Sequence, residues 1–178
     1  MIDALHLPLP LRTRAGDVTL RRARPEDAAS LISLLADDPI SAARGDVAAA
    51  ADAPVYEAAL VAIIADPANE LLVAEAAGAV IGTFQLTLIP GMARRGARRL
   101  LVEAVRVRQE SRSSGLGSAM MRWVTDVAAP DLDAALVQLT SDAARVDAHR
   151  FYERLGFTGS HVGFKYPVPS RGDDASSA

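Results

Sequence analysis

The sequence predicts an α/β protein in which a mixed central sheet carries helices on both faces. Two observations favour this class. Short segments with alternating apolar and polar residues recur along the chain, and segments with apolar residues at helical spacing lie between them. The chain has 178 residues, of which 50% are hydrophobic, and it contains no internal repeat. One domain with a substantial core therefore accounts for the whole pattern.

The expected elements follow the order β-α-α-β-β-β-α-β-α-β. Strands are expected where apolar and polar residues alternate, over residues 18–22, 70–75, 80–89, 99–107, 135–140 and 162–166. Helices are expected where the apolar residues have helical spacing, over a segment opened by Pro25 and over residues 55–65, 115–129 and 146–155. The polar, Ala-rich segment 41–53 carries the weakest signal.

The domain is expected over residues 17–168, with an N-terminal extension over 1–16 and a disordered tail over 169–178. The N-terminal segment lacks the basic region and apolar run of a targeting signal. No stretch of the chain reaches the roughly 18 apolar residues that a membrane span needs. We therefore expect a cytoplasmic protein that binds no membrane.

The composition excludes several function classes. The formal net charge of -3 argues against nucleic-acid binding through bulk electrostatics. The absence of cysteine excludes a thiolate nucleophile, a zinc–thiolate site and an acyl-cysteine intermediate, so any thioester chemistry has to proceed by direct transfer. Three histidines, His6, His149 and His161, show no ligand spacing, and we expect no metal site.

A glycine-rich turn is expected between the strand at 99–107 and the helix at 115–129. Its residues are Arg112, Ser113, Ser114, Gly115, Leu116, Gly117 and Ser118. Free N–H groups and the helix dipole at such a turn suit a pyrophosphate, although a turn that only caps the helix explains the glycines equally well. The dinucleotide fingerprint fails because Met120 occupies its third glycine position, and no Gly-Lys-Ser/Thr follows as in a nucleotide-triphosphatase loop. CoA is therefore a better candidate for the phosphate ligand of this turn than a dinucleotide or a nucleoside triphosphate.

Two motifs carry a resemblance to a known family. Val105-x-Val107 followed by Arg112-x-x-Gly115-x-Gly117 resembles the acetyl-CoA signature of the GNAT superfamily of N-acetyltransferases. The segment 148–157, with the pattern A-x-x-F-Y-x-x-x-G-F, resembles the helix that supplies a tyrosine facing the CoA sulfur in that superfamily. The resemblance covers residues 17–167 and implies the GNAT fold, acetyl-CoA as co-substrate and a possible homodimer.

The resemblance also implies where acetyl-CoA binds. Backbone groups near Val105 and Val107, at a bulge where neighbouring strands splay, would pair with the pantetheine amides like an added strand. The backbone N–H of Val107 would stabilise the oxyanion that forms during transfer. The seven residues of the glycine turn would hold the pyrophosphate.

Two side chains are candidates for proton transfer. By resemblance, Tyr152 would protonate the leaving CoA thiolate, whereas its other interpretation is a half-buried aromatic packed with Phe151. Alternation along the strand predicts Glu103 on the same face as Val105 and Val107, where its carboxylate could take a proton from the acceptor amine. A solvated or ion-paired carboxylate is the alternative for Glu103.

A narrower resemblance concerns the acceptor. The segment 147–152, followed by Ser160-His161 and Phe164, is similar to aminoalkylphosphonate and other small-amine N-acetyltransferases. It implies a primary amine of a small molecule, whose anionic group the arginines at 94, 95 and 98 could contact; a solvated loop or dimer contact also explains these arginines. The alternatives are a protein N-terminal or lysine acetyltransferase and a catalytically inactive acyl-CoA-binding module.

Overall fold

The computed structural model describes residues 2–14, 16–42, 45 and 48–168. The chain divides into two compact units, Met1–Leu139 and Thr140–Ala178. The first unit contains the sheet, and the second contains helix α7 (Val146–Arg154). The predicted mixed α/β class is confirmed. The predicted tail over 169–178 lies outside the described residues, as does part of segment 41–53.

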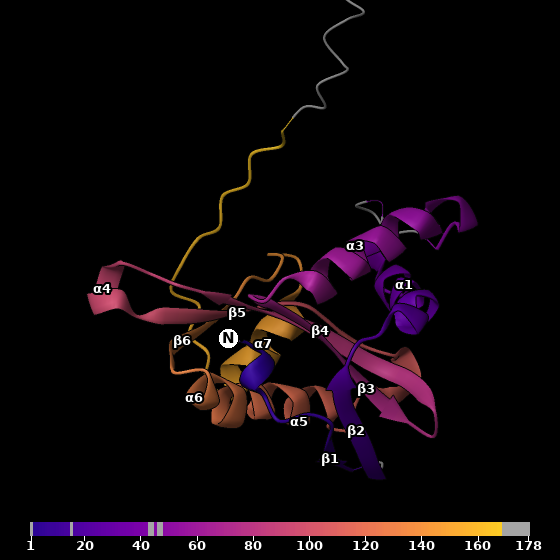
Figure 1. The fold of residues 1–178 in the computed structure, drawn as a ribbon, viewed down its shortest axis with the longest axis horizontal. Helices are drawn as coiled ribbons and strands as arrows, with labels where there is room; N and C mark the ends of the chain where they lie inside the picture. Colours follow the sequence, from indigo (N-terminus) through magenta and orange to yellow (C-terminus); the bar gives the residue numbers. More distant parts are fainter. Residues whose placement is uncertain (1, 15, 43–44, 46–47, 169–178) are drawn as a thin grey trace, which may run out of the picture. The chain divides into compact units, whose positions relative to one another are not determined.

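The first unit is built on a six-stranded sheet in which the strands lie in chain order (Figure 1). Neighbouring strands are antiparallel, except that β5 and β6 run parallel. The strands are β1 (Leu9–Thr13), β2 (Gly16–Arg22), β3 (Asn69–Ala76), β4 (Ala79–Ile89), β5 (Arg98–Val107) and β6 (Ala134–Leu139). Five of them match predicted strands to within two residues at each end.

The edge strand β1 lies in the segment predicted as an N-terminal extension. Pro8 and Pro10 weaken the strand signal in the sequence, but an edge strand tolerates proline because one side of its backbone needs no partner. The guanidinium of Arg22 donates hydrogen bonds to the carbonyl oxygens of Asp3 (3.1 Å) and Leu5 (3.0 Å). The extension is therefore held against the sheet.

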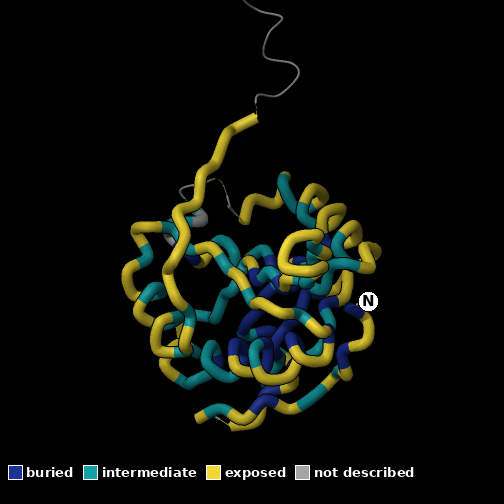
Figure 2. Tube along the Cα trace, turned by 90° about the vertical axis from the view of Figure 1, so that its left-hand side faces the viewer, coloured by how far each residue is buried: buried dark blue, intermediate teal, exposed yellow. Residues whose placement is uncertain are grey.

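Helices of the first unit cover both faces of the sheet (Figure 1). The face covered by α1 and α3, here called the upper face, includes Leu71 and Val73, which share a core cluster with Leu31 and Leu60. On the lower face, α5 places Trp123 against Phe84, with ring centroids 6.1 Å apart. Figure 2 shows the buried residues gathered between these layers. The helices of this unit are α1 (Ala28–Ala36), α2 (Pro39–Ala42), α3 (Ala53–Ala65), α4 (Ala93–Gly96), α5 (Leu116–Trp123) and α6 (Ala129–Asp131), with shorter turns at Ile2–Ala4, Pro25–Asp27, Ala50–Asp52 and Gln109–Ser111.

The helix predicted over 115–129 has a wider turn inside it. A π-helical turn, Val124–Ala128, lies between α5 and α6. Pro130 follows it and lacks the N–H that would bond to the carbonyl of Asp126 in an α-helix. The helical spacing of the apolar residues therefore predicted the helical segment. The π-helical turn within it lies just before a proline.

The strand predicted over 162–166 does not form. Residues 157–168 have no regular secondary structure, and Val162, Phe164 and Tyr166 are exposed (Figure 2). Alternation of apolar residues is necessary for a half-buried strand, but a strand also needs a neighbour to bond to. Within the described part of the chain no strand pairs with this segment.

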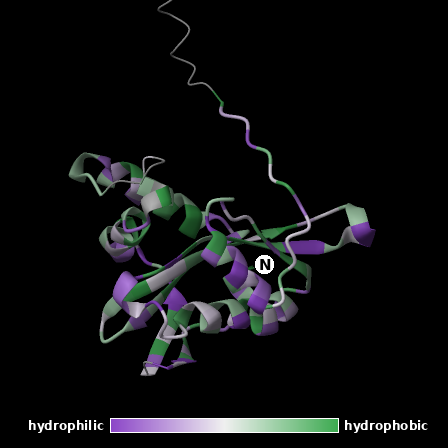
Figure 3. Cartoon of the chain, turned by 180° about the vertical axis from the view of Figure 1, so that it is seen from behind, coloured by the Kyte–Doolittle hydropathy of each residue, from purple (hydrophilic) through white to green (hydrophobic). Residues whose placement is uncertain are grey.

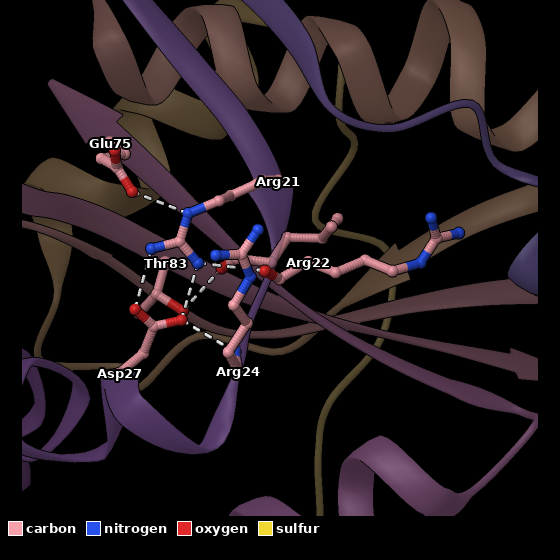
Figure 4. Close-up of polar contacts among 7 residues, drawn as sticks. Arg21, Arg22, Arg24, Asp27, Glu75 and Thr83 are labelled. Atoms are coloured by element: carbon pink, nitrogen blue, oxygen red, sulfur yellow. Dashed lines mark hydrogen bonds and ion pairs between the residues drawn. The ribbon is translucent and has the colours of Figure 1, made fainter. Parts of the chain in front are cut away.

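A partly buried ion-pair network joins the start of α1 to the upper face (Figure 4). Arg21 donates two hydrogen bonds to the carboxylate of Asp27 (2.7 and 2.8 Å) and one to Glu75 (2.7 Å). Asp27 is only 7% exposed, and it also accepts a hydrogen bond from the backbone N–H of Arg24 at 2.8 Å. The hydrogen bonds from Arg21 are the main reason that the pKa of Asp27 is lowered, even though burial opposes the shift.

We expect Asp27→Asn to lower the free energy of unfolding by about 3 kcal/mol at pH 7, because Arg21 would be left partly unpaired in a buried site. The pKa of Asp27 is lowered in the folded protein, so its contribution is present above its unfolded pKa and is lost as the pH falls through its folded pKa. The difference between parent and variant in urea unfolding should therefore shrink below about pH 4. The control is Asp133→Asn, which removes the ion pair between Asp133 and Arg98. The side chain of Asp133 is 90% exposed. That loss should stay under about 1 kcal/mol, and equal losses in the two variants would contradict the prediction.

Candidate functional site

Strand β5 contains a bulge in its second half. Gln85 of β4 pairs with Glu103, and Thr83 pairs with Arg106, so the single residue Phe84 lies opposite two residues of β5. The first of these two, Ala104, has φ of 50°. An extra residue with this conformation bends the strand and interrupts its ladder of hydrogen bonds.

The bulge lies where β5 loses its neighbour on one side. Pairing with β6 runs from Arg98↔Ala134 to Val102↔Leu139, where β6 ends. Strand β5 continues to Val107 and remains paired with β4. Backbone groups of residues 103–107 therefore face an open edge, and a ligand with amide groups could bond there as an added strand does. Val105 and Val107, which the family resemblance assigns to the pantetheine amides, lie on this edge.

The bulge corrects the prediction that Glu103 shares a face with Val105 and Val107. Glu103 lies opposite Gln85 on the upper face, and beyond the bulge Arg106 is the residue that returns to that face. Val107 lies opposite Gly82, whose added Cβ would contact Leu116, so Val107 belongs to the lower face. Strict alternation fails because one inserted residue shifts every later side chain to the other face.

Glu103 is exposed, and among the described residues its carboxylate has no hydrogen bond or ion-pair partner. The ion-paired alternative is therefore not observed within the part of the chain that the structure describes. An accessible carboxylate beside the open edge is able to receive a proton from an incoming amine.

The glycine turn connects β5 to α5 through two residues with positive φ, Ser113 (66°) and Gly115 (86°). Gly115 is the N-cap of α5 in the left-handed conformation, which glycine adopts without steric cost. The hydroxyl of Ser114 donates to the carbonyl of Ser111 (2.7 Å) and accepts from the N–H of Leu116 (3.3 Å). These contacts fix the backbone at the start of the helix.

Two further contacts tie the turn to the sheet. The Nε of Arg112 donates to the carbonyl of Val107 at 3.2 Å, and the backbone N–H of Arg14 donates to the carbonyl of Ser114 at 2.9 Å. Arg112 and Ser113 are exposed, whereas Leu116 is buried and anchors the first turn of α5. Gly117 and Ser118 lie in that first turn.

The start of α5 has the chemistry that a pyrophosphate requires. The first backbone hydrogen bond of the helix runs from Ala119 to the carbonyl of Gly115, so the N–H groups of Gly117 and Ser118 have no backbone acceptor, whereas that of Leu116 donates to the hydroxyl of Ser114. Together with the positive end of the helix dipole and the adjacent Arg112, these N–H groups favour an anion. The residues present therefore fit CoA, with its diphosphate on the turn and its amides along β5.

Gly82 is a site residue that the sequence analysis missed. A Cβ at this position would lie 3.2 Å from the carbonyl of Arg106 and 3.3 Å from both Leu116 and Met120. Its absence lets α5 pack closely on β4, which brings the glycine turn next to the end of β5. A glycine inside an otherwise regular strand pattern was the available signal.

Tyr152 belongs to the second unit and lies on α7. The helix ends in a Schellman motif, in which Phe157 N–H donates to the carbonyl of Tyr152 (3.1 Å) and Gly156 N–H donates to that of Glu153 (3.0 Å). Gly156 has the required positive φ of 91°. The Tyr152 ring packs edge-on against Phe151 (5.1 Å between centroids) and Phe157 (5.8 Å). The Gly-Phe end of the motif therefore fixes the ring that precedes it.

The histidines do not form a cluster. The Nε2 of His149 donates a hydrogen bond to the carbonyl of Asp142 at 2.8 Å. The Nδ1 of His161 and the hydroxyl of Ser160 form a hydrogen bond of 2.8 Å. In the described ranges, no group of three or more His, Cys, Asp or Glu side chains could hold a metal ion. No helix of those ranges is both long and apolar enough to cross a membrane.

The arginines considered for an anionic acceptor lie at the far end of β5. Arg94 and Arg95 lie in α4, at the tip of the β4–β5 hairpin, where Figure 3 shows hydrophilic and hydrophobic positions side by side, and Arg98 pairs with Asp133 at 2.7 Å. Arg98 and Ala104 are six positions apart on the extended strand, a span of about 20 Å. A small molecule with its amine at the bulge does not reach this tip.

Comparisons with known proteins agree with this geometry. A family model described as the acetyltransferase (GNAT) family matches residues 31–157. A transcriptional regulator from Bacillus halodurans C-125 is similar in structure, with 35% identity and a TM-score of 0.80 over 85% of this chain and 99% of that chain. A putative acetyltransferase from Agrobacterium tumefaciens str. C58 has 25% identity and a TM-score of 0.70 over 84% and 99% of the two chains. Glucosamine-6-phosphate N-acetyltransferase from Arabidopsis thaliana shares the fold, with 17% identity and a TM-score of 0.69 over 85% and 99% of the two chains. Among curated proteins no match is found.

The sheet, its bulged strand and the glycine turn define the class of acyl-CoA-dependent acetyltransferases. The chain belongs to the GNAT acetyltransferase family, in which acetyl-CoA is the co-substrate.

Proposed function

We propose that this protein transfers the acetyl group of acetyl-CoA to a primary amine of a small molecule by direct attack. The observation that carries the proposal is the open edge of β5 beside its bulge, which leads directly into the glycine turn and the N-terminus of α5. One surface thus offers backbone groups for the pantetheine amides and N–H groups for the diphosphate. Acetyl-CoA supplies an activated thioester, and the chain supplies binding and proton transfer.

Three groups of the chain have roles in the proposed reaction. The exposed carboxylate of Glu103 accepts a proton from the amine, directly or through a water molecule. The backbone N–H of Val107 stabilises negative charge that develops on the carbonyl oxygen. Tyr152, fixed by its aromatic neighbours, donates a proton to the departing thiolate.

The small-amine part of the proposal rests on the similarity of segment 147–152, with Ser160-His161 and Phe164, to small-amine N-acetyltransferases. A protein N-terminal or lysine acetyltransferase is the rival within enzymes. The similar Bacillus halodurans protein is named a transcriptional regulator. A regulatory module that binds acyl-CoA without catalysis is therefore the alternative outside the enzymes. The carboxylate of Glu103, which has no partner among the described residues, lies beside the open edge and favours an enzyme, since binding acyl-CoA alone does not need a proton acceptor there.

Acetyl-CoA at about 100 times its Kd should raise the melting temperature by about 5–10 °C, because a ligand that binds only the native state stabilises it by mass action. ATP and NAD at the same concentration serve as controls and should not match it. Release of free thiol should then be measured with a panel of small amines and with peptides. Thiol release on small amines supports the proposed function, release on peptides alone identifies a protein acetyltransferase, and stabilisation without release on any amine identifies a binding module.

A further inference from the structure

A chain of hydrogen bonds runs across the upper face toward the bulge. The carboxylate of Asp66, just after α3, accepts a hydrogen bond from the side-chain amide of Asn69 at 2.8 Å. The Oδ1 of Asn69 accepts two more, from the hydroxyl of Thr87 at 2.6 Å and from the Nε2 of Gln85 at 2.9 Å. Gln85 is the cross-strand partner of Glu103. We call the side chains of Asn69, Gln85, Thr87 and Glu103 the polar strip.

The polar strip lies at the margin of the covered part of the face. Leu71, which pairs with Gln85 on β3, is buried in the core cluster under α1 and α3. Asn69, Gln85 and Thr87 are half-buried, and Glu103 is exposed. Glu103 is also the last residue of β5 before the bulge, next to the point where pairing with β6 ends. The polar strip therefore borders the place where the proposed function puts the acetyl group.

The protons of this chain can be assigned from its chemistry. A carboxylate only accepts hydrogen bonds, so Asn69 must turn its NH2 group toward Asp66 and its oxygen toward Thr87 and Gln85. The hydroxyl of Thr87 donates its one proton to that oxygen. Gln85 must direct its NH2 group there as well, which leaves its Oε1 on the other side of the amide. The charge of Asp66 thus fixes the orientation of every group that follows.

A ligand on the polar strip meets mainly hydrogen-bond acceptors. These acceptors are the carboxylate of Glu103, the Oε1 of Gln85 and the hydroxyl oxygen of Thr87. Directly opposed side chains of a sheet have Cβ atoms about 4.5–5.5 Å apart, and residues two apart on one strand are about 7 Å apart. Two arginines flank the polar strip on this face. Arg106, opposite Thr83, donates to the carbonyl of Val105 at 2.9 Å, and Arg99, opposite Ile89, donates to the Oε1 of Gln138 at 3.5 Å.

We propose that the acceptor is a cationic amine with a second hydrogen-bond donor about 5–7 Å from the reacting nitrogen. Glu103 binds the reacting amine, while Gln85 and Thr87, oriented by Asn69, bind the second donor group. Gln85 and Thr87 are specificity-determining residues, and Asn69 is a positioning residue that acts through them. This inference rests on the proposed function and narrows its substrate class.

Three amines of similar length test the proposal. They are 1,4-diaminobutane, 1-aminobutane and 4-aminobutanoate, which end in a cation, a methyl group and an anion. Each is titrated calorimetrically onto the CoA complex and assayed for thiol release with acetyl-CoA. One hydrogen bond to a charged donor changes a binding constant by roughly 10- to 100-fold. The diamine should therefore exceed 1-aminobutane in affinity and in kcat/KM by at least about tenfold. The anionic amine should be the poorest ligand.

The variants Gln85→Leu and Asn69→Leu should each reduce the preference for the diamine over 1-aminobutane by on the order of tenfold, mainly through KM. Thr87→Val should give a smaller loss in the same direction. Thr19→Val is the matched control, because Thr19 is an exposed threonine on β2 outside the polar strip, and it should leave the preference unchanged. Acetyl-CoA affinity and melting temperature, measured for each variant, separate a loss of folding from a loss of selectivity.

Equal binding of the three amines, preference for 4-aminobutanoate, or no binding of any of them overturns the proposal. So does an unchanged preference in Gln85→Leu and Asn69→Leu variants that remain folded. Selective binding of the diamine that depends on Gln85, but without thiol release on any amine, supports the polar strip as a cation site and rejects the proposed transfer reaction alone. Binding and turnover thus report on the two proposals separately.

Discussion

Replacing Tyr152 with phenylalanine is expected to lower turnover by about 100- to 10,000-fold, the usual range for loss of a general acid. The variant keeps the ring that packs edge-on against Phe151 and Phe157, and it removes only the hydroxyl. A thiol is itself a fairly acidic leaving group, so the loss should lie toward the lower end of that range. The affinity for acetyl-CoA should change little, because the hydroxyl acts on the departing sulfur and not on the bound ground state.

Single-turnover kinetics, with acetyl-CoA affinity measured separately by calorimetry, check this result. Tyr166→Phe is the matched control, because Tyr166 lies in the same unit with 84% of its surface exposed and has no assigned role. If Tyr152→Phe turned over like the parent while chemistry was rate-limiting, Tyr152 would be a packing residue and water would protonate the thiolate.

Gly115→Val is expected to lower the affinity for CoA by at least about tenfold, since a left-handed residue with a branched side chain distorts the turn that receives the diphosphate. The φ of 86° at Gly115 also predicts a loss of about 1–2 kcal/mol in the free energy of unfolding. Gly117→Val should weaken CoA binding without that conformational cost, because Gly117 lies inside α5 and is not among the glycines with positive φ. Calorimetric titration with CoA and urea unfolding measure the two effects.

Gly78→Val separates strain from ligand binding. Gly78 has φ of 78°, an added Cβ there meets nothing within 4 Å, and the residue lies in the turn between β3 and β4. This variant should lose as much stability as Gly115→Val and bind CoA like the parent. Tight CoA binding by both Gly115→Val and Gly117→Val would mean that the diphosphate binds elsewhere.

Much of the candidate site follows from local sequence. The change from a strand period to a helical period at the glycines located the turn, and its seven candidate residues lie between the end of β5 and the first turn of α5. The Gly-Phe pair that closes α7 was recognisable as a motif, and the structure gives its physical basis as a cap that bonds back to the carbonyl of Tyr152. Such features depend on contacts within a few residues, which a single sequence records directly.

The position of Glu103 shows where local patterns stop being sufficient. Alternation assigned it to the face of Val105 and Val107, but the bulge at Ala104 places it opposite Gln85 on the other face from Val107. The family resemblance implies a bulge near Val105 and Val107, but the residues around Ala104 do not show which residue is inserted, because a bulge is defined by the partner strand and not by the bulged residue alone. The register between β4 and β5 therefore determines which side chains lie next to Glu103, the candidate base.

The sequence by itself determined the fold class, the four longer helical segments, five strands and the glycine turn, because hydrophobic period and turn chemistry are local properties. Only the tertiary structure decided that β1 joins the sheet, that residues 162–166 remain without a partner, and that Asn69, Gln85 and Glu103 form one polar strip. These outcomes depend on pairing between segments far apart in the chain. A slip of one residue in that pairing sends every later side chain to the opposite face of the sheet.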